Sequence, residues 1–318
     1  MNEIIVTKYS DNLSTIWDAF VDSTYGGTLH SKRSFLNYHK DKFQDYSLMF
    51  KIKNEIVAIL PAVIVDEKLI SHPGASYGGL IYKEKLKTES LIDINNVLNN
   101  ICEENNIESI EMRFPYSIVS KNHFDKLKYC LSKQTNKVSR EISQYIDLKS
   151  HQSGSYSENF NRILKKDHKL TTQPTTNKEE VFKFYTLLEQ NLLKHNTKPT
   201  HTFKELIYLI DNLKDECKVF LTTDEEGHIV SGSFVLELTK NTAHTFYLCS
   251  DYRFIKKSPL VNTIDYMAKY YKNLGFDHLN LGISTENKGE NINLSLNNFK
   301  EKFNSYGTVR ETFHININ

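Results

Sequence analysis

The chain has 318 residues, 39% apolar and 25% charged, a composition that supports a folded core and excludes an intrinsically disordered protein. Its 40 basic and 39 acidic residues give a net charge of +1, with no sign of the broad positive surface of a DNA-binding protein. No apolar run approaches the roughly 18 residues of a membrane-spanning helix, so any membrane association is expected to be peripheral.

The cysteines point to a reducing compartment. Cys102, Cys130, Cys217 and Cys249 are widely spaced and form no Cys-x-x-Cys pair. Met1 leads almost directly into a strand-like run, with no signal peptide ahead of it. We therefore expect a cytoplasmic protein.

The first half of the sequence alternates strand-like and helix-like patterns. Strands are expected over residues 4–9, 46–53, 56–65, 109–114 and 144–148, the second and third forming a hairpin. Helices are expected over 13–20, around Phe35 and Tyr38, over 91–101 and from about Asn122.

The second half repeats these patterns in the same order. Helices are expected from Phe160, over 181–192, over 203–213, from Pro259 and over 296–303, with strands over 218–223, 229–238, 243–250, 278–283 and 308–317. A long helix directly after a strand pair indicates a crossover connection, and hence some parallel pairing.

A polar stretch from Lys149 to Ser157 separates the two halves and has little to bury. Because the order of elements is shared, we expect two copies of one mixed α/β (α+β) unit, at residues 1–150 and 151–318. Each unit is expected to hold a mixed, largely antiparallel sheet with flanking helices.

The stretch from Ser71 to Leu80 interrupts the regular pattern. It contains Pro73, three glycines, His72 and Tyr77 directly after two apolar runs. Glycines permit close backbone approach and Pro73 ends strand pairing, so backbone amides in this loop need a partner such as a ligand's oxygen atoms. A tight turn around a buried Tyr77 explains the same residues.

Several short segments occur in an order that resembles one family. They are Gly27-Thr28-Leu29-His30, Phe35-Leu36, Leu60-Pro61-Ala62, Ser71-His72-Pro73-Gly74, Tyr77-Gly78-Gly79, Leu279-Asn280-Leu281-Gly282 and Phe299-Lys300-Glu301-Lys302-Phe303. Together they resemble the GNAT-type acyltransferases of the Fem/BioF2-like group, which are built from two tandem GNAT units. The resemblance covers essentially the whole chain.

This resemblance implies an enzyme that transfers an acyl group directly onto an amine, without a covalent intermediate. The implied acceptor is a nucleotide- or lipid-linked amino sugar of surface polysaccharide assembly, at the inner face of the cytoplasmic membrane. The implied donor is acyl-CoA, with acetyl-CoA one candidate. Two alternatives stay open: an aminoacyl-tRNA-dependent Fem-type transferase acting on a peptidoglycan precursor, and a non-catalytic binding protein on the same fold.

The expected donor site departs from the family in one respect. The ordinary GNAT pyrophosphate loop reads Arg/Gln-x-x-Gly-x-Gly/Ala, whereas the corresponding segment here reads Arg253-Phe254-Ile255-Lys256-Lys257-Ser258-Pro259. The missing glycines weaken the case for acetyl-CoA bound in the usual way. A pyrophosphate could still sit at the helix N-terminus, held by Arg253, Lys256, Lys257 and Ser258.

Acyl transfer to an amine needs a deprotonated amine, donors for a developing oxyanion and a proton route. His30 and His72 stand beside glycines and are candidate bases near pH 7, although a turn-capping histidine fits the same pattern. Glu237 alternates with apolar residues on a strand where, by the resemblance, GNAT enzymes often hold a carboxylate base.

The candidate substrate-binding residues are Tyr77, Gly78, Gly79, Arg113, Glu286 and Lys300. Glu111 and Arg113 share strand parity and point to one face, which an exposed sheet face also explains. Glu286 follows a strand end, where ligand sites of α/β proteins tend to lie. Lys300 could place its charge on a phosphate, although a solvated helix face accounts for it as well.

Other chemistries find no support in the sequence. It has no Gly-x-Ser-x-Gly, no clustered metal-ligand spacing and no phosphate loop, so hydrolase, metalloenzyme and nucleoside-triphosphatase interpretations are set aside and no metal is expected. Transfer RNA normally binds a broad positive surface. The near-zero net charge therefore disfavours the tRNA-dependent alternative without removing it.

Overall fold

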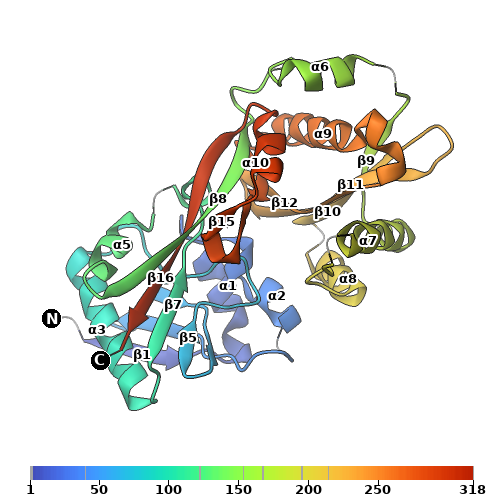
Figure 1. The fold of residues 1–318 in the computed structure, drawn as a ribbon. Coiled ribbons are helices and arrows are strands. Elements are labelled where there is room, and N and C mark those ends of the chain that lie inside the picture. Colours follow the sequence, from blue (N-terminus) through green and yellow to red (C-terminus); the bar gives the residue numbers. More distant parts are fainter. Residues whose placement is uncertain are drawn as a thin grey trace. The chain divides into compact units, whose positions relative to one another are not determined.

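The computed structural model describes residues 3–39, 41–121, 123–152, 154–166, 168–194, 196–213 and 215–317 (Figure 1). The chain forms two compact units. Unit 1 comprises Met1–Ile142, Thr285–Asn291 and Thr308–Asn318, and unit 2 comprises Ser143–Ser284 and Ile292–Gly307. The chain thus returns to unit 1 twice after leaving it. The predicted domain boundary within residues 149–157, where Ser153 lies outside the described residues, stays a prediction.

The strands of unit 1 form two groups. One is an antiparallel sheet in the order β1-β2-β3-β6, made of β1 (Ile4–Lys8), β2 (Leu48–Ile52), β3 (Glu55–Leu60) and β6 (Ile81–Tyr82). The other has the order β4-β5-β7-β16-β8, made of β4 (Val63–Val65), β5 (Lys68–Ile70), β7 (Ser109–Arg113), β16 (Tyr306–Asn316) and β8 (Thr135–Asp147). Strands β8 and β16 also contribute their other ends to unit 2.

The helical segments of unit 1 precede or connect these strands, with 3₁₀ helices labelled η. They are η1 (Asp11–Leu13), α1 (Ser14–Asp22), η2 (Leu29–Ser31), α2 (Arg33–Leu36), η3 (Asn37–His39), α3 (Thr88–Glu104), α4 (Ser117–Ser120), α5 (Asp125–Leu131) and η5 (Asn287–Gly289). The short strands β14 (Thr285–Glu286) and β15 (Asn291–Ile292) flank η5.

Strand β7 separates an apolar face from a polar face of unit 1. Ile110 and Met112 are buried in a core with Trp17 of α1 and Leu98 of α3. Successive side chains of a strand point to opposite faces, so the intervening Glu111 and Arg113 share the other face. An ion pair between them, 2.9 Å from Arg113 Nη2 to Glu111 Oε1, confirms the predicted parity.

The predicted strand over residues 56–65 is wrong in one respect, because it is two strands. β3 ends at Leu60, and β4 begins at Val63 and pairs with β5 instead of β2. Pro61 stands at the break. Proline has no backbone N–H to donate to a ladder, so a strand is expected to end there.

Unit 2 contains the remaining elements. Its strands, in the order β8-β13-β12-β11-β10-β9, include β9 (Thr171–Thr175), β10 (Cys217–Thr223), β11 (Ile229–Thr239), β12 (Thr242–Ser250) and β13 (His278–Ile283). Its helices are α6 (Glu158–Lys165), α7 (Lys178–Leu193), α8 (Phe203–Asn212), η4 (Tyr252–Lys257), α9 (Pro259–Asn273) and α10 (Leu294–Glu301).

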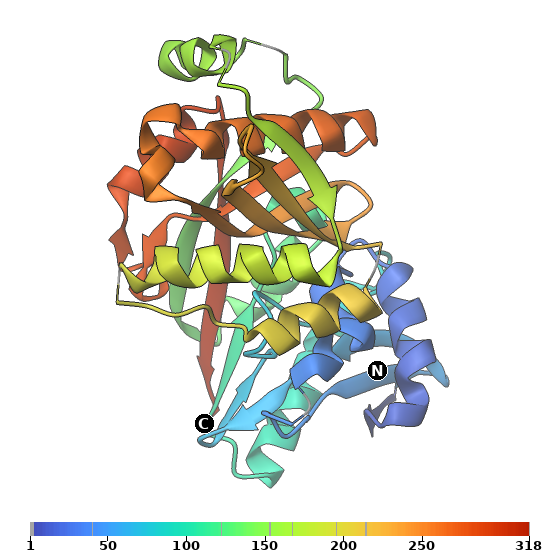
Figure 2. The same ribbon diagram turned by 90° about the vertical axis from the view of Figure 1, so that its right-hand side faces the viewer.

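Helices cover both faces of this sheet. Figure 2 shows α9 on one face and α7 on the other. The face under α9 holds an apolar core that includes Phe220 of β10, Ile264 and Met267 of α9, and Leu279 of β13. The fold is therefore mixed α/β with largely antiparallel sheets and flanking helices, as predicted.

Strands β12 and β13 pair in parallel across the α9 crossover, which confirms the expected parallel pairing. The ladder joins Thr242–His244 to His278–Asn280. β12 continues to Ser250, yet the described residues show no further pair with β13. Just past this point Phe246 forms a bulge, since its two neighbours pair with adjacent residues of β11. We call the place where the strands part the strand opening.

Candidate functional site

The predicted site residues are divided between the two units. Unit 1 holds His30, His72, Tyr77, Gly78, Gly79, Arg113 and Glu286, and unit 2 holds Glu237, Arg253, Lys256, Lys257, Ser258 and Lys300. Each group is described within its own unit.

A buried polar cluster lies at the strand opening of unit 2. Asn280, the last residue of β13 that pairs with β12, is fully buried. Its Oδ1 accepts hydrogen bonds from Gly282 N at 2.8 Å and Ser143 Oγ at 3.1 Å, and lies 2.9 Å from His244 Nδ1. The backbone N–H of Gly282 can only donate, which fixes the orientation of the Asn280 amide. The cluster holds the end of β13 in one geometry.

Lys300 of α10 also contacts the end of β13. Its Nζ donates to Gly282 O at 2.8 Å and to Ile283 O at 2.6 Å, the carbonyl oxygens of the last two residues of β13. The residue is 2% exposed, so a solvated helix face does not account for it. Burial lowers the pKa of Lys300 from 10.5 to about 7, because the charged form loses hydration. Its amino group can therefore gain or lose a proton near neutral pH.

The predicted pyrophosphate-binding segment folds into the 3₁₀ helix η4. Arg253 forms a two-pronged ion pair with Asp251, at 3.0 Å from Nε and 2.6 Å from Nη2 to Oδ2. Lys256 is exposed and Lys257 half-buried. Ser258 ends η4 in a left-handed conformation directly before α9, and its Oγ donates to Ile255 O at 3.3 Å. The binding role of these residues stays a prediction, but the guanidinium of Arg253 already has an anionic partner.

Glu237 lies on β11 opposite Ala243, next to the paired part of β12. Its Oε1 is 2.6 Å from Lys218 Nζ. Nearby charge from Glu237 also adds to the rise in the pKa of Tyr271, which burial causes in the first place. The ion pair gives Glu237 a structural partner, and its role as a base stays a prediction.

In unit 1, hydrogen bonds attach the glycine-containing loop to the end of β7. Ser71 N donates to Glu111 O and Ser71 Oγ accepts from Arg113 N, both at 2.9 Å. Gly78 N donates to Arg113 O at 2.9 Å. The predicted need of these loop amides for partners is thus met, at Ser71 and Gly78, by the neighbouring strand.

The loop brings two predicted site residues together. His30 is fully buried, and its ring centroid lies 4.8 Å from that of Tyr77, which is 1% exposed. Burial raises the pKa of Tyr77 well above its ordinary value, and Tyr116 adds to the rise. His72 is also buried, 6.0 Å from the ring of Phe43, and adopts a left-handed φ of 39° that is uncommon outside glycine.

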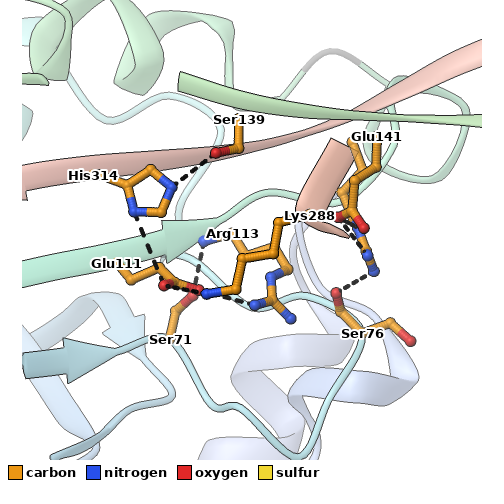
Figure 3. Close-up of polar contacts among 9 residues, drawn as sticks. Ser71, Ser76, Glu111, Arg113, Ser139, Glu141, Lys288 and His314 are labelled. Carbon is orange, nitrogen blue, oxygen red and sulfur yellow. Dashed lines mark hydrogen bonds and ion pairs between the residues drawn. The ribbon is translucent and has the colours of Figure 1, made fainter. Parts of the chain in front are cut away.

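A cluster of charged side chains covers the polar face of β7 (Figure 3). Besides its ion pair with Arg113, the Glu111 carboxylate has two further neighbours. Its Oε2 lies 3.7 Å from Lys288 Nζ and 3.9 Å from His314 Nδ1. The other ring nitrogen of His314 is 3.1 Å from Ser139 Oγ. Burial lowers the pKa of His314, while Glu111 opposes that change.

Arg310 closes the same cluster on the side of the loop. It donates to Ser76 O at 2.6 Å and to Glu141 at 2.6 and 2.9 Å. The cavity that this cluster lines has a volume of about 150 Å³, below the roughly 300 Å³ of small-molecule sites. It suits a single polar group better than a whole substrate. Glu286 lies outside this cavity lining, exposed on β14.

Several of these residues were not predicted from the sequence. Arg310 and His314 lie about 200 residues from β7 in the chain and reach it because β16 pairs with β7, whereas Lys288 comes from η5. The period-two spacing of Arg310, Thr312 and His314 on the last predicted strand is the one signal that marks a shared face.

No cluster of His, Cys, Asp or Glu that could hold a metal ion occurs among the described residues. Within the same part of the chain, no helix combines the length and apolar character needed to cross a bilayer.

No protein-family model and no curated protein sequence matches this chain. Solved structures do resemble it. A structure described as FemX is 12% identical, covers 96% of each chain and superposes with a TM-score of 0.67. L-PGS from Bacillus licheniformis is also 12% identical, over 96% of this chain and 92% of that chain, with a TM-score of 0.61. A tandem GNAT protein from the clavulanic acid biosynthesis pathway is 8% identical, over 99% of each chain, with a TM-score of 0.54.

At these identities the likeness defines the fold alone. The protein has the tandem GNAT fold, with the Fem-like arrangement expected from the sequence.

The close packing of Gly78 generates a first prediction. A Cβ at this position would lie 3.1 Å from Ser71 O and 3.3 Å from Ser71 Cβ, and one at Gly79 would lie 3.1 Å from Phe114. We expect Gly78→Val to lower the free energy of unfolding by about 1–3 kcal/mol through overpacking, and Gly78→Ala by less. Chemical denaturation measures both. A Val variant that keeps wild-type stability would contradict this and show that the glycine leaves space for a ligand.

The lowered pKa of Lys300 generates a second prediction. Between pH 7 and the ordinary pKa of 10.5, the unfolded chain binds the proton more than the folded chain does. The free energy of unfolding should therefore rise with pH in this window, by up to about 1.4 kcal/mol per pH unit, while below pH 7 the full cost of burying the charge is present. Denaturation of the wild type and Lys300→Met from pH 6 to 9.5 should show this rise only in the wild type.

The exposed Lys302 provides the matched control, because its variant Lys302→Met should keep the wild-type pH dependence. Parallel pH profiles for the wild type and Lys300→Met would disprove the lowered pKa.

Proposed function

We propose that the protein is a transferase that moves an acyl or aminoacyl group from an activated donor directly onto an amine. One observation carries this proposal. At the strand opening, beside a bulge at Phe246, β12 continues past its parallel partner, and the part of the chain that the structure describes pairs no other strand with that edge. Backbone N–H groups on such an edge can hold an extended ligand as an added strand would.

The opening supplies the donors that acyl transfer needs. A carbonyl lying along the free edge of β12 would accept from backbone N–H groups, which stabilise the oxyanion as it forms. The amine nitrogen attacks the carbonyl carbon and a C–N bond forms. The C–S bond of a thioester or the C–O bond of an ester then breaks, the amine loses a proton and the leaving group takes one up. No enzyme nucleophile is required.

Lys300 is a positioning residue in this scheme. Its ammonium satisfies the carbonyl oxygens of Gly282 and Ile283 from outside the ladder, so β13 can end without β12 beside it. When protonated, it places a positive charge at the strand opening, where the oxyanion is proposed to form.

The donor is an acyl-CoA or an aminoacyl-tRNA. The resemblance of the sequence motifs supports acyl-CoA. The structure of η4 favours the second candidate, because the segment has no open glycine loop and Arg253 is paired with Asp251. The likeness to FemX and L-PGS is compatible with either donor.

For the acceptor, the motif resemblance supports a nucleotide- or lipid-linked amino sugar of surface polysaccharide assembly, met at the inner face of the membrane. In unit 1, His30 is the proposed base and Tyr77 its neighbour, while Arg113 and Lys288 are cationic groups beside Glu111 on the polar face of β7. His72, at its unusual backbone angle, is the other candidate base.

The direct test supplies the purified protein with acyl-CoA and UDP- or dTDP-linked amino sugars, and separately with charged tRNA and a peptidoglycan precursor. Mass spectrometry of the acceptor identifies the transferred group. We expect a mass increase equal to one acyl or aminoacyl group. Failure with every donor would contradict the proposal and favour a binding protein on this fold.

With an active donor and acceptor, His30→Gln tests the base. The glutamine roughly preserves volume and polarity but cannot take up the amine proton, so kcat should fall by a hundredfold or more. His228, exposed at the β10–β11 turn, provides the control substitution His228→Gln. Unchanged turnover of His30→Gln in a folded variant would assign His30 a packing role.

A further inference from the structure

A second cavity in unit 1, which we call the Arg33 cavity, has a volume of about 340 Å³. Tyr9, Asp11, Arg33, Leu36, Phe43 and Asp45 contribute to its lining. This volume lies at the lower end of the range for small-molecule sites. His72, the other candidate base, also contributes to this lining, but the transferase proposal assigns the cavity no ligand.

Arg33 is an unusual residue to find in such a wall, because its side chain is 2% exposed. The guanidinium is held in place by three groups. Its Nη1 pairs with Asp45 Oδ2 at 2.5 Å, and its Cζ lies 3.4 Å from the ring centroid of Tyr9 and 4.2 Å from that of Trp17. Each contact restricts the guanidinium before any ligand arrives.

Two donors of this guanidinium are not used. Nε and Nη2 of Arg33 have no hydrogen-bond partner among the described residues, and neither has the buried hydroxyl of Tyr9 on the same cavity. Buried polar groups nearly always find partners, since leaving one unpaired forfeits its hydration. Two residues of one cavity with unmet donors therefore indicate a missing ligand.

The geometry of the unused donors defines the anionic part of that ligand. Nε–H and an Nη2–H lie side by side on one edge of the planar guanidinium, which matches two oxygens of a carboxylate or phosphate. A group with a single acceptor would leave one of these donors unpaired.

The carboxylates of the cavity define the other part. Asp45 already balances the charge of Arg33, and Asp11 adds a further negative charge. A simple anion would add to the uncompensated negative charge of Asp11, whereas a ligand that also carries an ammonium group would offset it. Leu36 and Phe43 offer apolar surface to the rest of the molecule.

We propose that the Arg33 cavity binds a small zwitterion, such as a free amino acid or an amino-phosphate compound. Its carboxylate or phosphate accepts from Nε and Nη2 of Arg33, and its ammonium lies beside Asp45 and Asp11. This site does not depend on the transferase proposal.

Calorimetric titration with matched probes tests the proposal. L-leucine carries both charged groups, isocaproate lacks the ammonium and isoamylamine lacks the carboxylate. We expect L-leucine to bind with at least tenfold higher affinity than either single-charge probe. O-phosphoethanolamine and inorganic phosphate form the second arm, in which tighter binding of O-phosphoethanolamine than of L-leucine would assign the anionic group as a phosphate.

Two variants locate the binding. Arg33→Lys keeps the charge but loses the paired donors, and should weaken zwitterion binding at least tenfold. Because Arg33 is buried, circular dichroism must first show that this variant folds. Asp11→Asn changes an exposed residue, so this variant should fold. It should weaken the binding of the zwitterion and leave the binding of isocaproate unchanged. The control Asp22→Asn, at an exposed acid outside the lining, should change nothing.

Three results would overturn the proposal. Isocaproate or phosphate binding as tightly as its zwitterionic partner would define a simple anion site. If the zwitterion binds both Arg33→Lys and Asp11→Asn as tightly as the wild type, its binding site lies outside the Arg33 cavity. No binding by any probe at millimolar concentration would leave only water in the cavity.

Discussion

At the end of β13, hydrogen bonds from the Lys300 amino group to two backbone carbonyl oxygens replace hydration that both partners lose on burial. A buried carbonyl without a partner costs about 1–3 kcal/mol, and a buried ammonium without acceptors costs more. The pKa of Lys300 is lowered because the two carbonyl oxygens replace only part of the hydration that the ammonium group loses on burial. With these carbonyls satisfied by a side chain, β13 does not need β12 beside it, and a parallel pair can part inside a folded unit.

The regular elements were predictable because their apolar residues follow a period. The strand over residues 278–283 was predicted with the bounds that the structure has, and α9 begins at Pro259 as expected. Strand β8 was predicted over 144–148 but starts at Thr135. Its first part is half-exposed on both faces, so no apolar alternation marks it. Pro61 is a strand-breaking residue, but the continuous apolar run around it led to the prediction of a single strand.

The site was less accessible from the sequence than the fold. The shared face of Glu111 and Arg113 follows from strand parity, and the burial of Tyr77 agrees with the account of its loop as a tight turn. Two competing accounts of Lys300, a phosphate contact and a solvated face, both assumed exposure, and burial could not be read from its charged neighbours. Arg310 and His314 join the cluster through pairing between strands that lie far apart in the chain, which no local pattern encodes.

The chain's late return to unit 1 also bears on how the protein is made. Thr308–Asn318 supplies β16, the neighbour of β7, and Thr285–Asn291 supplies Lys288. During synthesis, the first 142 residues leave the ribosome long before this strand exists, and the edge of β7 has no neighbour on that side. Unit 1 therefore cannot complete its sheet until almost the whole chain has been translated, whereas most of unit 2 has already emerged. Pairing over such a sequence distance is slow to form and leaves an open strand edge prone to aggregation. The strand that is made last is thus the one that covers the edge of β7.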